Sequence, residues 1–174
     1  AIAATPAAAQ FAPSPHSADP HRNLPQPPDR LSKQPVQEET RGLDFLFGAL
    51  KAAPDKASAK HVEARIWALW ASTPSDTVAL LMARVRTAIE HKDVPLALKL
   101  LDAVVQIRPD YVEGWNRRAT VHLLANDQAR ALADIRQVLV REPRHFAALV
   151  GLGMILRDLG EEARALEAFR RALD

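Results

Sequence analysis

The stretch Pro109-Asp110-Tyr111-Val112-Glu113-Gly114-Trp115 has a counterpart 34 residues later, at Pro143-Arg144-His145-Phe146-Ala147-Ala148-Leu149. Beyond these two segments, residues that suit a packed core keep the same interval. The matching pairs are Trp115 and Leu149, Ala131 and Ala165, Ile135 and Phe169, and Val138 and Ala172. Within each copy the apolar residues recur at helical spacing on both sides of a short turn, which is the pattern of two helices joined by a turn. The sequence therefore predicts an all-α fold of stacked antiparallel helix pairs.

A third copy precedes these two, because the same interval counted backwards leads to Leu81, Ala97, Leu101 and Val104. We predict helix pairs over residues 76–108, 109–142 and 143–174, the first of them with Asp76 as its N-cap. The turns inside the pairs are expected at His91-Lys92-Asp93, Ala125-Asn126-Asp127 and Leu159-Gly160-Glu161.

The pattern over residues 43–75 predicts one more helix pair, whose first helix is short and whose spacing does not keep the register of the other repeats. Leu43, Leu46, Phe47 and Leu50 recur at helical spacing before a stop at Pro54, and a second helix follows from about residue 57 to 71. An atypical terminal repeat is what a stack of repeats needs at its end. We expect Trp67 and Trp70 of this pair to anchor its core, and the folded domain to span residues 43–174.

Residues 1–42 differ in composition from the rest. Ala7 and Ala9 fit the small-x-small rule of a bacterial signal peptidase, so we expect a cut after Ala9 that leaves Gln10 as the mature N-terminus. The alternative is an Ala/Pro-rich linker that follows another domain. From residue 11 to about 41 prolines recur without a period and few residues are apolar, which predicts a disordered tail.

Composition and charge exclude several classes of function. The net charge of +2 over 174 residues is too weak a field to indicate a nucleic-acid partner. There is no cysteine, so disulfides and thiolate metal sites are impossible. No apolar run approaches the roughly 18 residues that a membrane span requires.

The repeat resembles the tetratricopeptide repeat family over residues 78–174, and more weakly over residues 43–76. The resemblance is carried by Pro109, Pro143, the Leu152-Gly153 pair and Phe169, and by the small residues at Ala97, Ala131 and Ala165. It implies a right-handed α-solenoid that binds proteins. Two departures occur in the middle repeat: His122 stands where the family usually has tyrosine, and Arg118-Ala119 replaces the usual Leu-Gly pair.

The amino-acid sequences of the segments around Trp67 and Trp115 are also similar to those of exported tetratricopeptide proteins of alphaproteobacteria. That similarity implies a periplasmic location and a role in maintaining the cell envelope through contacts with an envelope protein. Two alternatives stay open: a cytoplasmic adaptor or regulatory subunit, and the scaffold domain of a larger enzyme.

No constellation of residues in the sequence favours catalysis, a metal or a cofactor. None of the six histidines forms the helical pair with glutamate that a zinc protease needs. We expect His122 to be a core residue with a satisfied hydrogen bond, and His16 and His21 to lie in the tail. Gly151-Leu152-Gly153 falls inside a predicted helix, where small residues serve helix packing rather than nucleotide binding. We therefore predict no enzyme activity, no metal and no cofactor.

A protein-binding groove is the remaining candidate site. In the architecture that the resemblance implies, the first helix of each pair lines a concave face suited to an extended or helical peptide. The residues expected there are Met82, Arg86, Ile89, Glu113, Asn116, Thr120, Leu123, Ala147, Val150, Met154 and Arg157. They do not reproduce the lysine and asparagine set with which some family members hold the terminal carboxylate of a chaperone.

The last predicted helix mixes Arg164, Arg170 and Arg171 with apolar residues, and no polar capping helix follows it in the sequence. A terminal repeat normally needs such a cap for solubility. We expect this helix either to be covered by a partner or by a second copy of the chain in a homo-oligomer, or to be followed by more of the natural protein.

Overall fold

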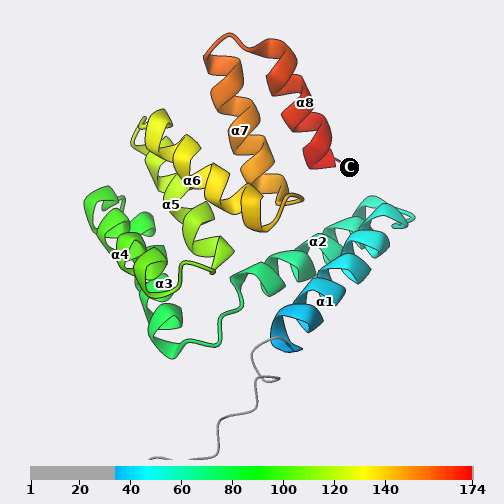
Figure 1. The fold of residues 1–174 in the computed structure, drawn as a ribbon, viewed down its shortest axis with the longest axis horizontal. Helices are drawn as coiled ribbons and strands as arrows, with labels where there is room; N and C mark the ends of the chain where they lie inside the picture. Colours follow the sequence, from blue (N-terminus) through cyan, green and yellow to red (C-terminus); the bar gives the residue numbers. More distant parts are fainter. Residues whose placement is uncertain (1–33, 174) are drawn as a thin grey trace, which may run out of the picture. The chain divides into compact units, whose positions relative to one another are not determined.

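A computed structural model describes residues 34–173 of the protein. Helices follow one another throughout this part of the chain, and it contains no strand (Figure 1). The predicted cut after Ala9, and the predicted tail as far as residue 33, lie outside the described residues. From residue 39 onward the chain forms one compact unit.

Eight helices make up the described part. Their bounds are α1 Gln34–Lys51, α2 Lys56–Ala71, α3 Asp76–Glu90, α4 Val94–Ile107, α5 Val112–Leu124, α6 Gln128–Arg141, α7 Phe146–Asp158 and α8 Glu162–Leu173. The helices of each pair α3–α4, α5–α6 and α7–α8 pack against each other, and α4 packs on α5 as α6 does on α7. This is the predicted all-α arrangement of antiparallel helix pairs in a row.

The turn inside each pair has the same backbone geometry at the same place in the repeat. Lys92, Asn126 and Gly160, each 34 residues apart, have φ of 58°, 59° and 78°. This left-handed conformation suits glycine and asparagine, whereas a lysine adopts it at some cost. Asp93 and Asp127 then accept a hydrogen bond from the third residue of the next helix and cap it. The turns thus lie where the spacing predicted them.

Two helix starts differ from the prediction. Ser75, rather than Asp76, is the N-cap of α3, and its hydroxyl accepts a hydrogen bond from the backbone N–H of Val78 at 3.4 Å. Helix α1 begins at Gln34, inside the segment expected to be a disordered tail. Its second residue is Pro35, and proline is tolerated in a first helical turn because the N–H it lacks has no partner there. Pro35 therefore does not prevent this helix, contrary to the prediction of a disordered tail up to residue 41.

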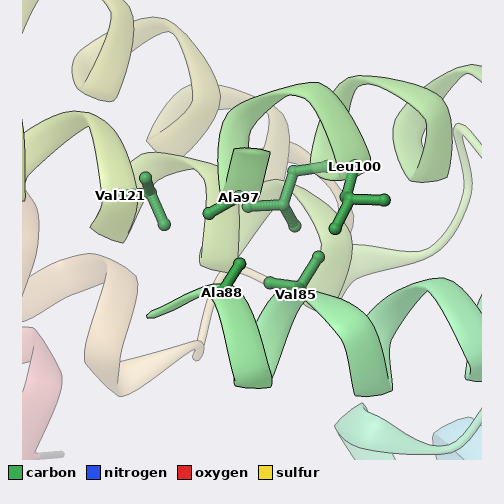
Figure 2. Packing of buried hydrophobic residues seen from close by; sticks show 6 residues of the cluster. Val85, Ala88, Ala97, Leu100 and Val121 are labelled. Carbon is green, nitrogen blue, oxygen red and sulfur yellow. The ribbon is translucent and has the colours of Figure 1, made fainter. Parts of the chain in front are cut away.

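The core lies between the paired helices and is formed where small residues let them approach. Ala97 and Ala131 are fully buried, and Ala165 is nearly so. Figure 2 shows Val85 and Ala88 of α3 facing Ala97 and Leu100 of α4. Trp115, expected to be a buried anchor, is only half-buried. Its indole Nε1 donates a hydrogen bond to the carbonyl of Pro109 at 2.9 Å, and the guanidinium of Arg118 lies 4.9 Å from its ring.

The leading pair, α1 and α2, does not sit where a terminal repeat in register would place it. Helix α2 contacts α5, and its two tryptophans reach the start of α7, where Trp67 packs against Phe146 with ring centroids 5.2 Å apart. An ion pair of 2.7 Å joins Asp44 of α1 to Arg144, just before α7. Trp67 and Trp70 do anchor an aromatic core, as predicted. However, that core also includes His145 and Phe146, which belong to the third repeat.

Candidate functional site

A cavity of about 540 Å³ opens between α3 and α5, beside the end of α2. We call it the α3–α5 cavity. Its lining residues are Ala71, Thr73, Ala79, Met82, Val85, Arg86, Ile89, Glu90, Tyr111, Glu113 and Arg117. Helix α3 supplies most of the wall because Met82, Arg86 and Ile89 lie three or four residues apart and therefore share one helix face. Val78, Val85 and Ala88 fix this helix by packing into the core.

The wall of the cavity combines apolar surface with charges of both signs. Met82 and Ile89 are partly buried against the core, whereas Arg86 and Glu90 are exposed. Arg86 forms no hydrogen bond or ion pair with any residue of the described part. Its guanidinium is thus available to a ligand, next to an apolar surface that suits an aliphatic or aromatic side chain.

The carboxylate of Glu113 forms the back of the cavity and is almost completely buried, with 1% of the residue exposed. Oε2 accepts a hydrogen bond from Nδ2 of Asn116 at 2.8 Å, and Oε1 accepts one from Nε of Arg117 at 2.5 Å. His145, which has no exposed surface, places Nε2 3.7 Å from Oε2. A buried charge needs such partners, so this network serves the interior of the protein.

These contacts correct the sequence prediction for Glu113 and Asn116. Both were expected to present their side chains to a partner, but Asn116 is only 6% exposed and is committed to Glu113. The physical reason is that His145, just before α7, packs against the face of α5 that carries Glu113. A polar residue on the inner face of a helix looks the same in sequence whether solvent or a second polar residue faces it.

Tyr111 closes the cavity on the side of α2. Its hydroxyl donates a hydrogen bond to the carbonyl oxygen of Ala71 at 2.9 Å, across 40 residues of sequence. Burial of the phenol raises the pKa of Tyr111 to about 12, and the nearby negative charge of Glu113 acts in the same direction. The phenol is therefore neutral and works as a hydrogen-bond donor at physiological pH.

The remaining predicted groove residues are spread over α5 and α7. Thr120 is exposed and donates a hydrogen bond to the backbone carbonyl of Asn116, while Leu123 packs into the core against Ile155 and its neighbours. On α7, Ala147 is half-buried, and Val150, Met154 and Arg157 are exposed. Arg157 is engaged with Asp158 at 2.9 Å. The structure thus brings Met82, Arg86, Ile89 and Glu113 together and leaves the others elsewhere.

Sequence reasoning missed several residues of the cavity. Ala79 and Glu90 follow from the same helical spacing as Met82 and Arg86, so that signal was present. Tyr111 and Arg117 lie near Glu113 in sequence but were not assigned to the face. Ala71 and Thr73 could not have been found, because no pattern in the sequence indicates that the end of α2 lies beside α3 and α5.

A second cavity, of about 490 Å³, lies where α7 and α8 meet the leading pair. It is lined by Leu50, Glu63, Phe146, Val150, Phe169, Ala172 and Leu173. Val150 is the one predicted groove residue here, and its apolar surroundings offer little polar chemistry.

The described histidines do not gather into a site. His122 is buried, as predicted, with Nε2 3.8 Å from Oδ2 of Asp134, but its Nδ1 has no hydrogen-bond partner in the described part of the chain. The expectation of a satisfied hydrogen bond is therefore wrong for that atom. Residues 34–173 hold no group of three or more histidine, aspartate and glutamate side chains that could hold a metal ion. None of the described helices has both the length and the apolar character to cross a membrane.

Comparisons with known proteins agree with this geometry. The tetratricopeptide repeat family model matches residues 116–174. A TPR repeat-containing protein of Rhizobium etli is 43% identical over 134 residues, which are 76% of this chain and 65% of that protein. The chain thus spans 65% of the length of this curated relative.

Solved structures of low sequence identity share the fold. MamA is 14% identical with a TM-score of 0.53, and the match covers 82% of this chain and 91% of MamA. YrrB, a TPR protein with an unusual peptide-binding site, is 18% identical with a TM-score of 0.52 over 81% and 79% of the two chains. The TPR2B domain of yeast Sti1 in complex with pHsp70 is 20% identical with a TM-score of 0.53 over 56% and 78%.

Proposed function

Because the chain belongs to the tetratricopeptide repeat family, whose fold serves as a scaffold for protein–protein interaction, we propose that it is a non-enzymatic scaffold and that a peptide segment of its partner binds in the α3–α5 cavity. The observation that carries the proposal is the unpaired guanidinium of Arg86 beside the apolar wall of Met82 and Ile89. An extended or helical segment would place an apolar side chain on that wall.

The charges around the cavity indicate which charged side chains the partner's peptide segment should carry. Arg117 is held by Glu113, so Arg86 is the cation that faces a ligand without a partner in the described part of the chain. We expect an acidic side chain of the partner to pair with it. Glu90 lies one turn further along α3 and repels a second acidic group there, so the segment should carry its negative charge at one end only.

Two proteins with the same fold support peptides as the ligand class. YrrB has a peptide-binding site and the Sti1 domain forms a complex with pHsp70. Their sequence identities of 18% and 20% are too low to transfer the peptide itself. The residues of the cavity in this chain must therefore define the preference.

The proposed place of action is the periplasm, in the maintenance of the cell envelope. The support is Ala7 and Ala9 at the spacing that a signal peptidase accepts. N-terminal analysis of the protein recovered from its native cells tests this: a mature chain that begins at Gln10 supports export. A chain that retains residues 1–9 in the cytoplasm would favour the adaptor alternative.

The binding site is tested with two arginines of the same helix. Arg84 and Arg86 are both exposed on α3 and neither has a partner among the described residues, but only Arg86 lines the cavity. Peptides selected from a random display library on the wild-type chain are measured by fluorescence anisotropy. Arg86→Glu should weaken their binding at least about tenfold, whereas Arg84→Glu should leave it within about twofold. Equal effects of the two substitutions would place the peptide elsewhere.

A further inference from the structure

The start of α7 is occupied by aromatic side chains that come from another part of the chain. The ring of Trp70 on α2 stacks on the ring of His145, with centroids 4.0 Å apart and an angle of 18° between the planes. Trp67 meets the rings of His145 and Phe146 edge-on, at 5.7 and 5.2 Å. Trp67 and Trp70 lie on one side of α2 because they are three residues apart. We call the surface that His145 and Phe146 form at the start of α7 the α7 site.

The polar atoms of this contact are poorly satisfied. His145 caps α7, since its Nδ1 accepts a hydrogen bond from the backbone N–H of Ala148 at 3.3 Å. In the neutral ring the proton therefore sits on Nε2. That atom has no hydrogen-bond partner within the described residues, because Glu113 Oε2 is 3.7 Å away, and neither has Nε1 of Trp70. Two buried N–H groups without acceptors make this contact weaker than its aromatic stacking alone would suggest.

Solvent-accessible clefts border the contact on two sides. The α3–α5 cavity borders the C-terminal end of α2 at Ala71, and a cavity of about 480 Å³ borders α1 and α7 at Phe47 and Phe146. The ion pair between Asp44 and Arg144 is exposed, with 59% and 41% of the side chains accessible, so solvent screens it.

Helices α1 and α2 also pack against each other through residues that do not belong to the contact with α7. Leu46 of α1 and Ile66 of α2 are buried in one cluster, and Leu43, Leu50 and Val62 pack against them. Only Ile66 and Trp70 of α2 are buried, so much of that helix already faces solvent. The segment between α2 and α3 is short, from residue 72 to 75, and can act as a hinge without unfolding either helix.

We propose that the α7 site is a binding site for an aromatic helix, that α2 fills it as an intramolecular ligand, and that a partner helix with two aromatic side chains one turn apart displaces the leading pair. Because α2 occupies the site with Trp67 and Trp70, we expect the partner to be an amphipathic helix with a tryptophan or a similar ring at positions i and i+3. The proposal adds a second site to the chain, and it stands whether or not a peptide binds in the α3–α5 cavity.

The experiment uses the chain's own α2 as the probe. A fluorescent peptide of residues 56–71 is added to the full chain and to the full-chain variant Trp67→Ala/Trp70→Ala, in which the site is vacated. We expect the peptide to bind the double variant at least about tenfold more tightly than the wild type, where the tethered α2 competes at high effective concentration.

Two controls isolate the tryptophans. A peptide in which both are alanine should bind neither protein. The variant Leu69→Ala removes a side chain of the same helix that is 36% exposed and outside the contact, so it should behave as the wild type. Equal binding of the peptide to both proteins, or no binding to a folded double variant, would overturn the proposal.

A second variant tests the same idea if the double variant does not fold. Asp44→Ala removes the exposed ion pair to Arg144 and leaves every aromatic ring in place. Amide hydrogen exchange in α2 should then rise about twofold to fivefold, while exchange in α6 stays unchanged. Unchanged exchange in α2, or an equal rise in both helices, would show that the leading pair is a fixed part of the fold.

Discussion

Tyr111 is the single tyrosine of the chain, so its titration can be followed without interference. Burial raises the pKa of its phenol to about 12, against about 10 in an unfolded chain. Since the neutral form is favoured in the folded state, the stabilisation is complete below pH about 10 and is lost as the pH rises toward about 12.

We therefore expect the free energy of unfolding to fall between those two pH values, and phenolate absorbance to appear only as the protein unfolds or near the upper value. Tyr111→Phe should remove this pH dependence and cost about 0.5–1.5 kcal/mol at neutral pH through the lost hydrogen bond to Ala71. Phenolate that forms near the ordinary pKa in a folded chain would contradict the buried geometry.

At the scale of the helices, one arginine joins α4, α5 and α6. The guanidinium of Arg118 donates to both carboxylate oxygens of Asp134, at 2.8 and 2.7 Å, and to Asp102 at 2.8 Å. The pKa of Arg118 is raised, chiefly by the hydrogen bonds to Asp134. Arg118, which stands where the sequence comparison with the repeat pattern expects leucine, thus forms a polar tie between three helices, while Ala119 beside it keeps the small buried residue.

The two aspartates should differ sharply when removed. Asp134 has a side chain that is 4% exposed and Asp102 one that is 55% exposed. Asp134→Ala leaves a mostly buried cation without its main partner and should cost about 3–5 kcal/mol, whereas Asp102→Ala should cost at most about 1 kcal/mol. Denaturant unfolding of both variants measures this. Similar losses would mean that the buried pair adds nothing beyond a surface contact.

At the scale of the whole described unit, α2 connects the two proposed sites. Its Trp67 and Trp70 fill the α7 site, and its last residue, Ala71, lines the α3–α5 cavity and accepts the hydrogen bond of Tyr111. A partner that displaces α2 from one site therefore changes the wall of the other. We therefore expect the two sites to be coupled through the position of α2, which contributes residues to both.

Tyr111 reports this coupling. In the variant Trp67→Ala/Trp70→Ala, release of α2 exposes the phenol and removes its acceptor, so its pKa should fall from about 12 toward about 10. Leu69→Ala should leave it unchanged. The pH titration of phenolate absorbance in the two variants gives the comparison, and an equal pKa in both would show that α2 does not leave the cavity when its tryptophans are lost.

The sequence predicted the helix pairs because the signals are local and repeated. Ala97, Ala131 and Ala165 mark where paired helices approach, and their spacing of 34 residues is visible without any structure. The turns at Lys92, Asn126 and Gly160 follow from the same interval. Part of the candidate site followed as well: Met82, Arg86 and Ile89 share a helix face at any position of that helix in the fold.

What only the tertiary structure decided is which of those faces meets solvent. Asp44 pairs with Arg144 across 100 residues and Tyr111 with Ala71 across 40, and neither distance is a multiple of the repeat. The sequence by itself therefore determined a row of helix pairs and predicted an inner face that mixes apolar and polar residues. The return of α2 onto the start of α7 comes from long-range packing of aromatic side chains, and Glu113 is buried beside His145 of the next repeat. Both contacts depend on surfaces that meet only after the helices have formed.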